Sequence, residues 1–133
     1  MEEKTLNSRK EYKLKKYAEK YKTHERLLIA STTRKTIRYI ERNTSNFPNK
    51  YLILKNKIIE ASYSILENVY RANIFQEKED KKEIIVNINM LNFYLEEALR
   101  KELISTKKFE SYVKHLIEID KMTRSWFMYE KSK

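Results

Sequence analysis

The fold follows from residues 50–73, which read KYLILKNKIIEASYSILENVYRAN. Apolar residues recur there at three- and four-residue steps, the spacing that gathers side chains on one face of an α-helix. One stripe consists of Leu54, Ile58, Ala61, Ile65, Val69 and Ala72, and a second, on an adjacent face, of Leu52, Ile59, Tyr63, Leu66 and Tyr70. A helix in a lone bundle needs only one such face. Two faces predict a helix that packs inside a bundle and also against another subunit.

The same periodicity predicts a first helix from Ser8 to Arg42, opened by a capping box at residues 8–11. This segment is either one long helix or two pieces, with the break then expected at the polar 31–33 step. Its apolar stripe consists of Leu14, Tyr17, Tyr21, His24, Leu28, Thr33, Ile37 and Ile40. Residues 43–49 contain the single proline and form the clearest loop in the chain.

Two further helices follow the charged connector at residues 76–81. One is expected over 81–103, with a stripe of Ile84, Ile88, Leu91, Leu95, Ala98 and Leu99. Ser105 and Thr106 then supply an N-cap, because short hydroxyl side chains bond the exposed amides of a helix start. The last helix carries a stripe of Phe109, Val113, Leu116, Asp120, Thr123 and Phe127, with Ile119 and Trp126 alongside.

Composition supports an all-α fold in one domain spanning residues 1–133. The chain contains no glycine and one proline, whereas a β-rich fold of this size draws on glycine for its tight turns. Hydrophobic residues make up 41% and charged residues 36%, a balance typical of helical bundles. Helices of matched length with short connectors favour an antiparallel up-and-down four-helix bundle.

The sequence predicts a cytoplasmic protein. It contains no cysteine, which excludes disulfides and thiolate metal sites. No apolar run approaches the roughly 18 residues that a membrane span requires, and the N-terminus lacks the apolar core of a signal peptide. We therefore expect neither a membrane span nor a disulfide framework.

Positive charge is concentrated in the first part of the chain, whose formal net charge is +10. Residues 1–50 carry 14 basic and 6 acidic side chains, whereas residues 51–133 carry 15 and 13. Codon bias would spread an excess of lysine evenly along the chain. The uneven distribution instead favours an anionic partner.

Three of the eight arginines, Arg34, Arg38 and Arg42, recur every four residues and so follow one side of the first helix, with Lys35 beside them. Arginine binds phosphate through a planar fork. A looser cationic run precedes this stripe and includes Lys13, Lys16 and Lys20. We interpret both as contacts to a nucleic-acid backbone without base readout.

Two other interpretations of the basic surface stay open. It is a solvated helix face partly neutralised by Glu19, Glu25 and Glu41, or, as a weaker rival, a face that lies on anionic lipid. The apolar side of the first helix is expected to be needed by the bundle, which argues against the lipid interpretation.

No motif predicts an enzyme, a metal site or a cofactor. Neither His24 nor His115 is preceded by the glutamate of the Glu-x-x-His motif of di-iron bundles, or by the arginine that helical-bundle ribonucleases carry. We interpret both histidines as interface or partly buried polar residues. Glu96 and Glu97 point about 100° apart on a helix and do not converge on one substrate atom.

From residue 43 to 127 the chain resembles the bacterial "four helix bundle protein" family. Residues 46–50 (Asn-Phe-Pro-Asn-Lys) look like the family's loop before the second helix, and 65–73 and 103–109 resemble its next two landmarks. Residues 118–126 (Glu-Ile-Asp-Lys-Met-Thr-Arg-Ser-Trp) are similar to the ending of the accessory variability determinant (Avd) proteins of diversity-generating retroelements. Compared with that family, residues 1–20 look like a basic N-terminal extension of the first helix.

The resemblance implies a homopentamer that binds nucleic acid and a reverse transcriptase and supports the synthesis of retroelement cDNA. The alternative is a structural or regulatory homo-oligomer, like the related large-subunit rRNA intervening-sequence proteins, with no reverse transcriptase partner. Acids at Glu96 and Glu97, where Avd proteins tend to carry a basic residue, shift the expected basic surface to the first helix. The oligomer interface is expected at the second stripe of residues 52–70 and at Trp126 and Phe127.

Overall fold

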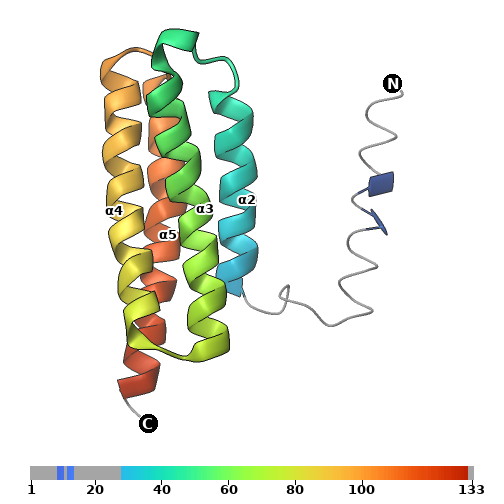
Figure 1. The fold of residues 1–133 in the computed structure, drawn as a ribbon, viewed down its shortest axis with the longest axis vertical. Helices are drawn as coiled ribbons and strands as arrows, with labels where there is room; N and C mark the ends of the chain where they lie inside the picture. The colour runs from blue at the N-terminus through green and yellow to red at the C-terminus, as the bar shows by residue number, and fades with distance from the viewer. Residues whose placement is uncertain (1–8, 11, 14–27, 132–133) are drawn as a thin grey trace.

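The described part of the protein is a four-helix bundle without strands (Figure 1). In this computed structural model, residues 9–10, 12–13 and 28–131 are described, with side chains as far as residue 127. The elements are α2 (Leu28–Thr44), the short 3-10 helix η2 (Asn49–Tyr51), α3 (Leu52–Phe75), α4 (Lys78–Arg100) and α5 (Thr106–Lys131).

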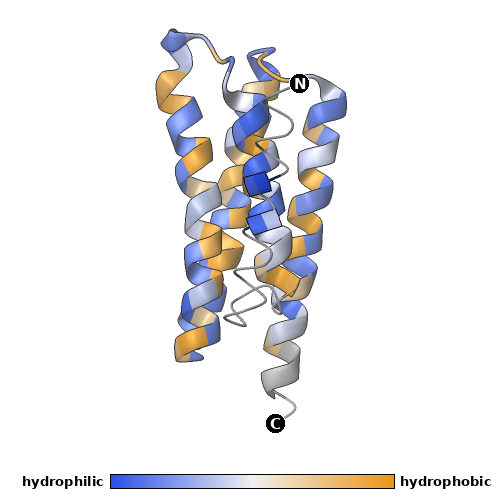
Figure 2. Cartoon of the chain, turned by 90° about the vertical axis from the view of Figure 1, so that its right-hand side faces the viewer, coloured by the Kyte–Doolittle hydropathy of each residue, from blue (hydrophilic) through white to orange (hydrophobic). Residues whose placement is uncertain are grey.

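The four helices pack side by side around one core. α3 contacts α2 and α4, and α5 contacts α4 and α2, so that each helix has two neighbours. The α2–α3 and α4–α5 connections lie at one end of the bundle, and the α3–α4 connection lies at the other (Figure 1). Hydrophobic and hydrophilic residues alternate along each helix (Figure 2), as expected for amphipathic helices with one buried side.

The stripes predicted for α3 and α4 form the centre of the core. In α3, Ile58, Ala61, Ile65, Val69 and Ala72 are buried, and in α4, Ile84, Ile88, Leu91, Leu95 and Ala98 are buried. Leu54 and Leu99, at the edges of these two stripes, are half-buried against the same cluster. Both predicted stripes are therefore confirmed.

Of the two alternatives for the first helix, a break at residues 31–33 is wrong, because these residues lie inside the continuous helix α2. The hydroxyl of Thr33 donates a hydrogen bond to the carbonyl of Ile29 at 2.7 Å, and the hydroxyl of Thr36 donates one to Thr32 at 2.8 Å. Each side chain thus satisfies its own polar group within the helix. The place predicted for Leu28 in the buried stripe is also wrong, since Leu28 is 68% exposed and Ile29 faces the core instead.

The predicted boundaries of three elements move slightly. α3 extends to Phe75, and α4 begins at Lys78, so the expected connector at 76–81 shrinks to Gln76 and Glu77. The acidic Glu79 and Asp80 occupy the first turn of α4, where the helix dipole favours negative charge. The predicted loop at 43–49 also shortens, because α2 continues to Thr44. Phe47, in the remaining loop, is buried.

The N-cap predicted at Ser105 is confirmed, but the buried face of α5 is turned from the one we expected. The Ser105 hydroxyl oxygen accepts a hydrogen bond from the backbone N–H of Lys108 at 3.1 Å. Tyr112, Leu116, Ile119 and Thr123 are buried, whereas Val113 and Asp120 are only half-buried. Tyr112, which is fully buried, was not part of the predicted stripe.

Two helices end with a left-handed residue that is not glycine. Gln76 has φ 56° and Glu102 has φ 59°. The N–H of Gln76 donates to the carbonyl of Ala72 at 3.0 Å, and the N–H of Leu103 donates to that of Ala98 at 2.9 Å. These bonds satisfy the last carbonyls of α3 and α4, at the cost of placing a Cβ atom in the left-handed region.

We expect Gln76→Gly to stabilise the protein, because glycine adopts this conformation without the Cβ clash. The gain should be about 0.5–1 kcal/mol, since the greater freedom of glycine in the unfolded chain offsets part of it. Chemical denaturation monitored by circular dichroism measures the change. Gln76→Ala is the matched control and should leave stability close to that of the wild type. A loss of stability in Gln76→Gly would contradict this account of the turn.

Candidate nucleic-acid interface

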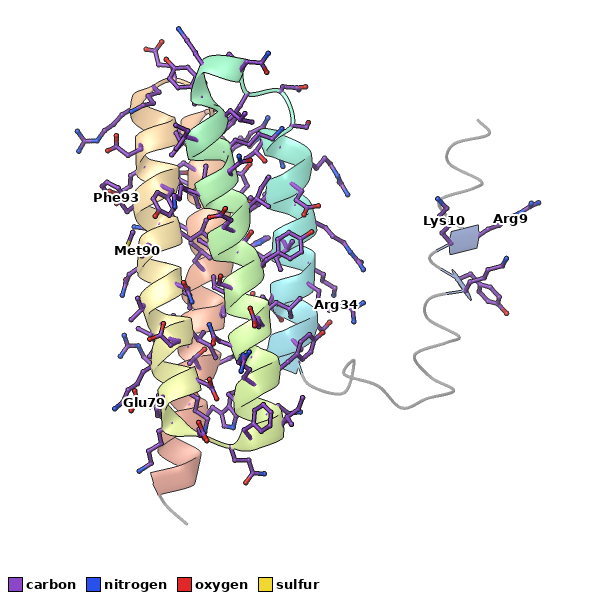
Figure 3. All side chains as sticks on the ribbon, in the orientation of Figure 1. Arg9, Lys10, Arg34, Glu79, Met90 and Phe93 are labelled. Atoms are coloured by element: carbon purple, nitrogen blue, oxygen red, sulfur yellow. The ribbon has the colours of Figure 1, made fainter. Side chains whose placement is uncertain are left out.

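The arginine stripe lies on the outer side of α2. Arg38, Arg42 and Lys35 are exposed, and Arg34 is half-buried. Arg34 points away from the bundle (Figure 3). The core-facing residues of α2, among them Ile37 and Ile40, occupy the opposite side. Because each residue rises 1.5 Å along a helix, the stripe from Arg34 to Arg42 is about 12 Å long.

Three of these cations, Arg34, Lys35 and Arg42, differ from the other arginines of the bundle in their partners. Arg71 pairs with Glu67 at 3.2 Å, Arg100 with Glu97 at 3.7 Å and Arg124 with Asp120 at 2.8 Å, in each case within one helix. In the part of the chain that the structure describes, Arg34, Lys35 and Arg42 have no acidic side chain within ion-pair distance. Their charge is therefore not cancelled by a near neighbour.

Glu41 is the one acid of α2, and its carboxylate accepts a hydrogen bond from the hydroxyl of Tyr63 on α3. This hydrogen bond is the main reason that the pKa of Tyr63 is raised, followed by burial and by the charge of the carboxylate. The contact ties the outer side of α2 to α3 beside the arginine stripe.

Aromatic packing holds α2 against α5 on the other side. The Tyr39 ring meets Tyr112 edge-on, with 5.2 Å between centroids and 63° between planes, and it lies 5.5 Å from the ring of His115. Tyr112 is fully buried and His115 is half-buried. The helix that presents the arginines is thus fixed to both of its neighbours.

The predicted lysine run lies mostly outside the described residues. Lys13 has helical backbone and is exposed. Lys16, Lys20 and His24 fall among the residues that are not described, as do Leu14, Tyr17 and Tyr21 of the first predicted stripe. Whether the first helix continues without a break from Ser8 therefore stays a prediction.

The residues predicted at the oligomer interface differ in how far they are buried in their own bundle. Leu66 and Tyr70 pack against the core of their own bundle and Ile59 is half-buried, whereas Leu52 and Tyr63 are 51% and 49% exposed.

A second exposed apolar stripe follows α4 and was not predicted. It consists of Val86, Met90 and Phe93, which are 51%, 40% and 50% exposed, and Met90 and Phe93 point outward in Figure 3. Its spacing of four and three residues is visible in the sequence. The longer stripe from Ile84 to Leu99 masks it, because both stripes run along the same helix with the same period.

Trp126 and Phe127 lie close to a buried lysine. Both rings are half-buried, and Trp126 packs against the core. The Nζ atom of Lys81 on α4, which is fully buried, lies 4.6 Å from the centre of the Trp126 ring and 5.6 Å from that of Phe127. The rings present their negative faces to the ammonium group, an attraction that ties the first turn of α4 to α5. No sequence pattern indicates this contact, since its partners are more than 40 residues apart.

Among the described residues, no group of three or more histidine, aspartate or glutamate side chains could hold a metal ion. The helices in the same part of the chain also lack any apolar stretch of the length that a membrane span needs. No protein-family model matches the sequence, and a search of curated proteins finds no significant match. The resemblance to the Avd proteins therefore stays a prediction.

We expect the Tyr112→Phe variant to lose less stability at high pH than the wild type. Burial, and then the neighbouring Tyr39, raise the pKa of Tyr112 to about 12. The unfolded chain releases this proton near the ordinary value of 10, so the contribution of Tyr112 is fully present below pH 10 and is lost as the pH rises from 10 through 12. Urea denaturation from pH 8 to 11.5 should show a shallower decline in the variant.

At neutral pH this variant should be as stable as the wild type, to within about 1 kcal/mol, or slightly more stable. The Tyr112 hydroxyl neither donates nor accepts a hydrogen bond within the described part of the chain. Its removal therefore leaves no other polar group without a partner. Tyr12→Phe, which alters a tyrosine that is 66% exposed, is the control for titration at the surface. Identical pH profiles for wild type and Tyr112→Phe would show that the buried hydroxyl does not titrate as described.

Proposed function

We propose that this protein is a non-enzymatic nucleic-acid-binding protein that contacts the phosphate backbone through the outer side of α2. The observation that carries the proposal is the contrast in ion pairing. Arg71, Arg100 and Arg124 are paired with acids on their own helices, whereas Arg34 and Arg42 have no such partner within the described residues. A cation without a neighbouring acid keeps its field and its donors for an external anion.

The form of the stripe supports phosphate as that anion. Guanidinium groups bind phosphate oxygens through two parallel N–H donors, and a rigid helix holds these groups in a row. A row of cations on the convex side of one helix reaches phosphates without surrounding a base edge, which favours binding without sequence readout. Such binding releases condensed counterions, so its affinity falls steeply with added salt.

The resemblance refines this proposal to an accessory protein that associates with a reverse transcriptase and supports retroelement cDNA synthesis. As part of this proposal, the helices run antiparallel in up-and-down order, and the protein assembles into a homopentamer in the cytoplasm. The exposed apolar side chains of α3 and α4, Leu52, Tyr63, Val86, Met90 and Phe93, support self-association, since water contacts them in a lone protomer. A reverse-transcriptase gene beside the gene for this protein would support the association.

A structural or regulatory homo-oligomer is the second candidate. In that case the charge of α2 maintains solubility and has no ligand. The same exposed apolar residues favour this candidate equally, so the two functions are separated only by binding to nucleic acid.

We expect the triple variant Arg34→Gln/Arg38→Gln/Arg42→Gln to lose most of its affinity for RNA. Each phosphate contact contributes a salt-dependence slope of about 0.7 for a single strand, so removing three should lower the slope by about 2. Fluorescence anisotropy with a labelled homopolymeric RNA, at about 50 to 300 mM salt, measures this slope.

The matched control is Arg71→Gln/Lys82→Gln/Arg124→Gln, which removes the same charge from three cations that are paired with acids. This control should bind like the wild type. Equal losses in the two triple variants would show that net charge alone drives binding. A wild-type protein that shows no salt-sensitive affinity for RNA or DNA would exclude the proposed function.

We expect Trp126→Ala to weaken both the bundle and any oligomer. The substitution removes a half-buried ring from the core and from the Lys81 contact, which should cost about 2–3 kcal/mol. Thermal unfolding and native mass spectrometry measure the two effects. Tyr51→Ala, at the other end of the bundle, serves as the aromatic control. An unchanged melting temperature and subunit number would contradict the role assigned to Trp126.

A further inference from the structure

Four cations from three segments gather at the end of the bundle where α2 meets α3 and α4 meets α5 (Figure 1). They are Arg42 in the last turn of α2, Lys50 in η2, and Lys107 and Lys108 in the first turn of α5, and all four are exposed. We call this group the basic end. No acidic side chain of the described residues lies within ion-pair distance of any of them.

The packing of α2 on α5 makes the basic end continuous with the arginine stripe. Tyr39 contacts His115, so this side of α5 faces α2. Lys108 precedes His115 by seven residues, which is about two turns, and therefore lies on the same side of α5. Arg42 follows Tyr39 by about one turn toward the same end. The line of arginines on α2 thus leads to the lysines of α5.

The starts of α4 and α5 differ in their acids. The first turn of α4, at the opposite end, contains Glu79 and Asp80, which the helix dipole stabilises. The first turn of α5 contains no acid and carries Lys107 and Lys108 instead. Two cations beside the exposed amides of a helix start repel the positive end of the dipole and attract anions. This arrangement adds to the field of Arg42 and Lys50.

The neighbouring cations of the α4 terminus do not belong to the basic end. Arg100 and Lys101 share the carboxylate of Glu97, at 3.7 and 3.2 Å. An aromatic ring does belong to it, because the Nζ atom of Lys50 lies 5.1 Å from the centre of the half-buried Tyr51 ring. A tyrosine ring among cations is a surface on which an unpaired base can stack.

We propose that the basic end is a second phosphate-contact surface and that its ligand is a single strand of RNA or DNA, which runs along α2 and turns over the end of the bundle. This inference rests on the proposed function. A duplex has a persistence length of about 150 base pairs and cannot turn from the side of a helix onto the end of so small a bundle. A single strand can follow this path, with its phosphates on the cations and a base against Tyr51.

The test compares Lys107→Gln/Lys108→Gln with Lys78→Gln/Lys82→Gln, which removes two lysines from the start of α4 at the opposite end. The probes are a homopolymeric RNA of about 30 nucleotides, the DNA of the same sequence, and the corresponding DNA duplex. We expect the α5 variant to lower the salt slope for both single strands by about 1.4, from two contacts at about 0.7 each. The α4 variant should leave it unchanged, and the slope for the duplex should change in neither variant.

A dependence on length provides a second readout. Shortening the single strand from about 30 to about 10 nucleotides should weaken binding to the wild type more than to the α5 variant, because the variant has lost the second surface. All these positions are exposed and outside the core, and matching far-ultraviolet circular dichroism spectra will show that each variant is folded.

The inference is overturned if the α5 and α4 variants have equal slopes for single strands, or if the α5 variant loses duplex binding to the same extent. In these two cases the wild type still binds and the triple arginine variant of α2 still loses affinity, so the proposed function stands. Failure of the wild type to bind any of the three probes would overturn the proposed function and this inference together.

Discussion

Burial of the apolar side of α3 between two neighbouring helices holds the bundle together. Ile58, Ile65 and Val69 are at most 1% exposed, and they pack where α3 meets α4 and α2. Burying side chains of this size stabilises the fold by about 1.5–3 kcal/mol each. Since α4 and α5 bury their own stripes in the same core, the charged faces are left on the outside. The basic surface is therefore a consequence of the packing that forms the bundle.

α2 completes this core with polar residues as well as apolar ones. Thr33, Thr36 and Thr44 are buried, and their hydroxyls bond to carbonyls one turn earlier, at 2.7, 2.8 and 2.9 Å. A helix with so few large apolar residues can thus pack closely and still carry four cations on its outer side. Tyr39 on one flank and the Glu41–Tyr63 contact on the other hold that side in place. Because the backbone that carries these charges is already fixed, binding a polyanion costs little conformational entropy beyond that of ordering the arginine side chains.

Ion pairing of the cations differs between parts of the described bundle. On α3, α4 and α5 many of the cations sit three or four residues from an acid, which cancels their field at short range. Arg34, Lys35 and Arg42 on α2 and the two lysines at the start of α5 have no such pair within the described residues, and the end of α2 and the start of α5 lie at the same end of the bundle (Figure 1). A protein with a net charge of +10 can in this way direct its charge toward one ligand path instead of spreading it over the surface.

Short-range spacing along the chain was enough to predict the helices after residue 28, the buried stripes of α3 and α4, the cap at Ser105 and the row of arginines on α2. It was not enough to predict which side of α5 is buried, which rings cover Lys81, or that Tyr39 of α2 packs against Tyr112 of α5. These features appear only when the helices are packed together. Periodicity records which residues share a face of one helix, whereas the neighbour of that face is chosen by packing among residues far apart in the chain.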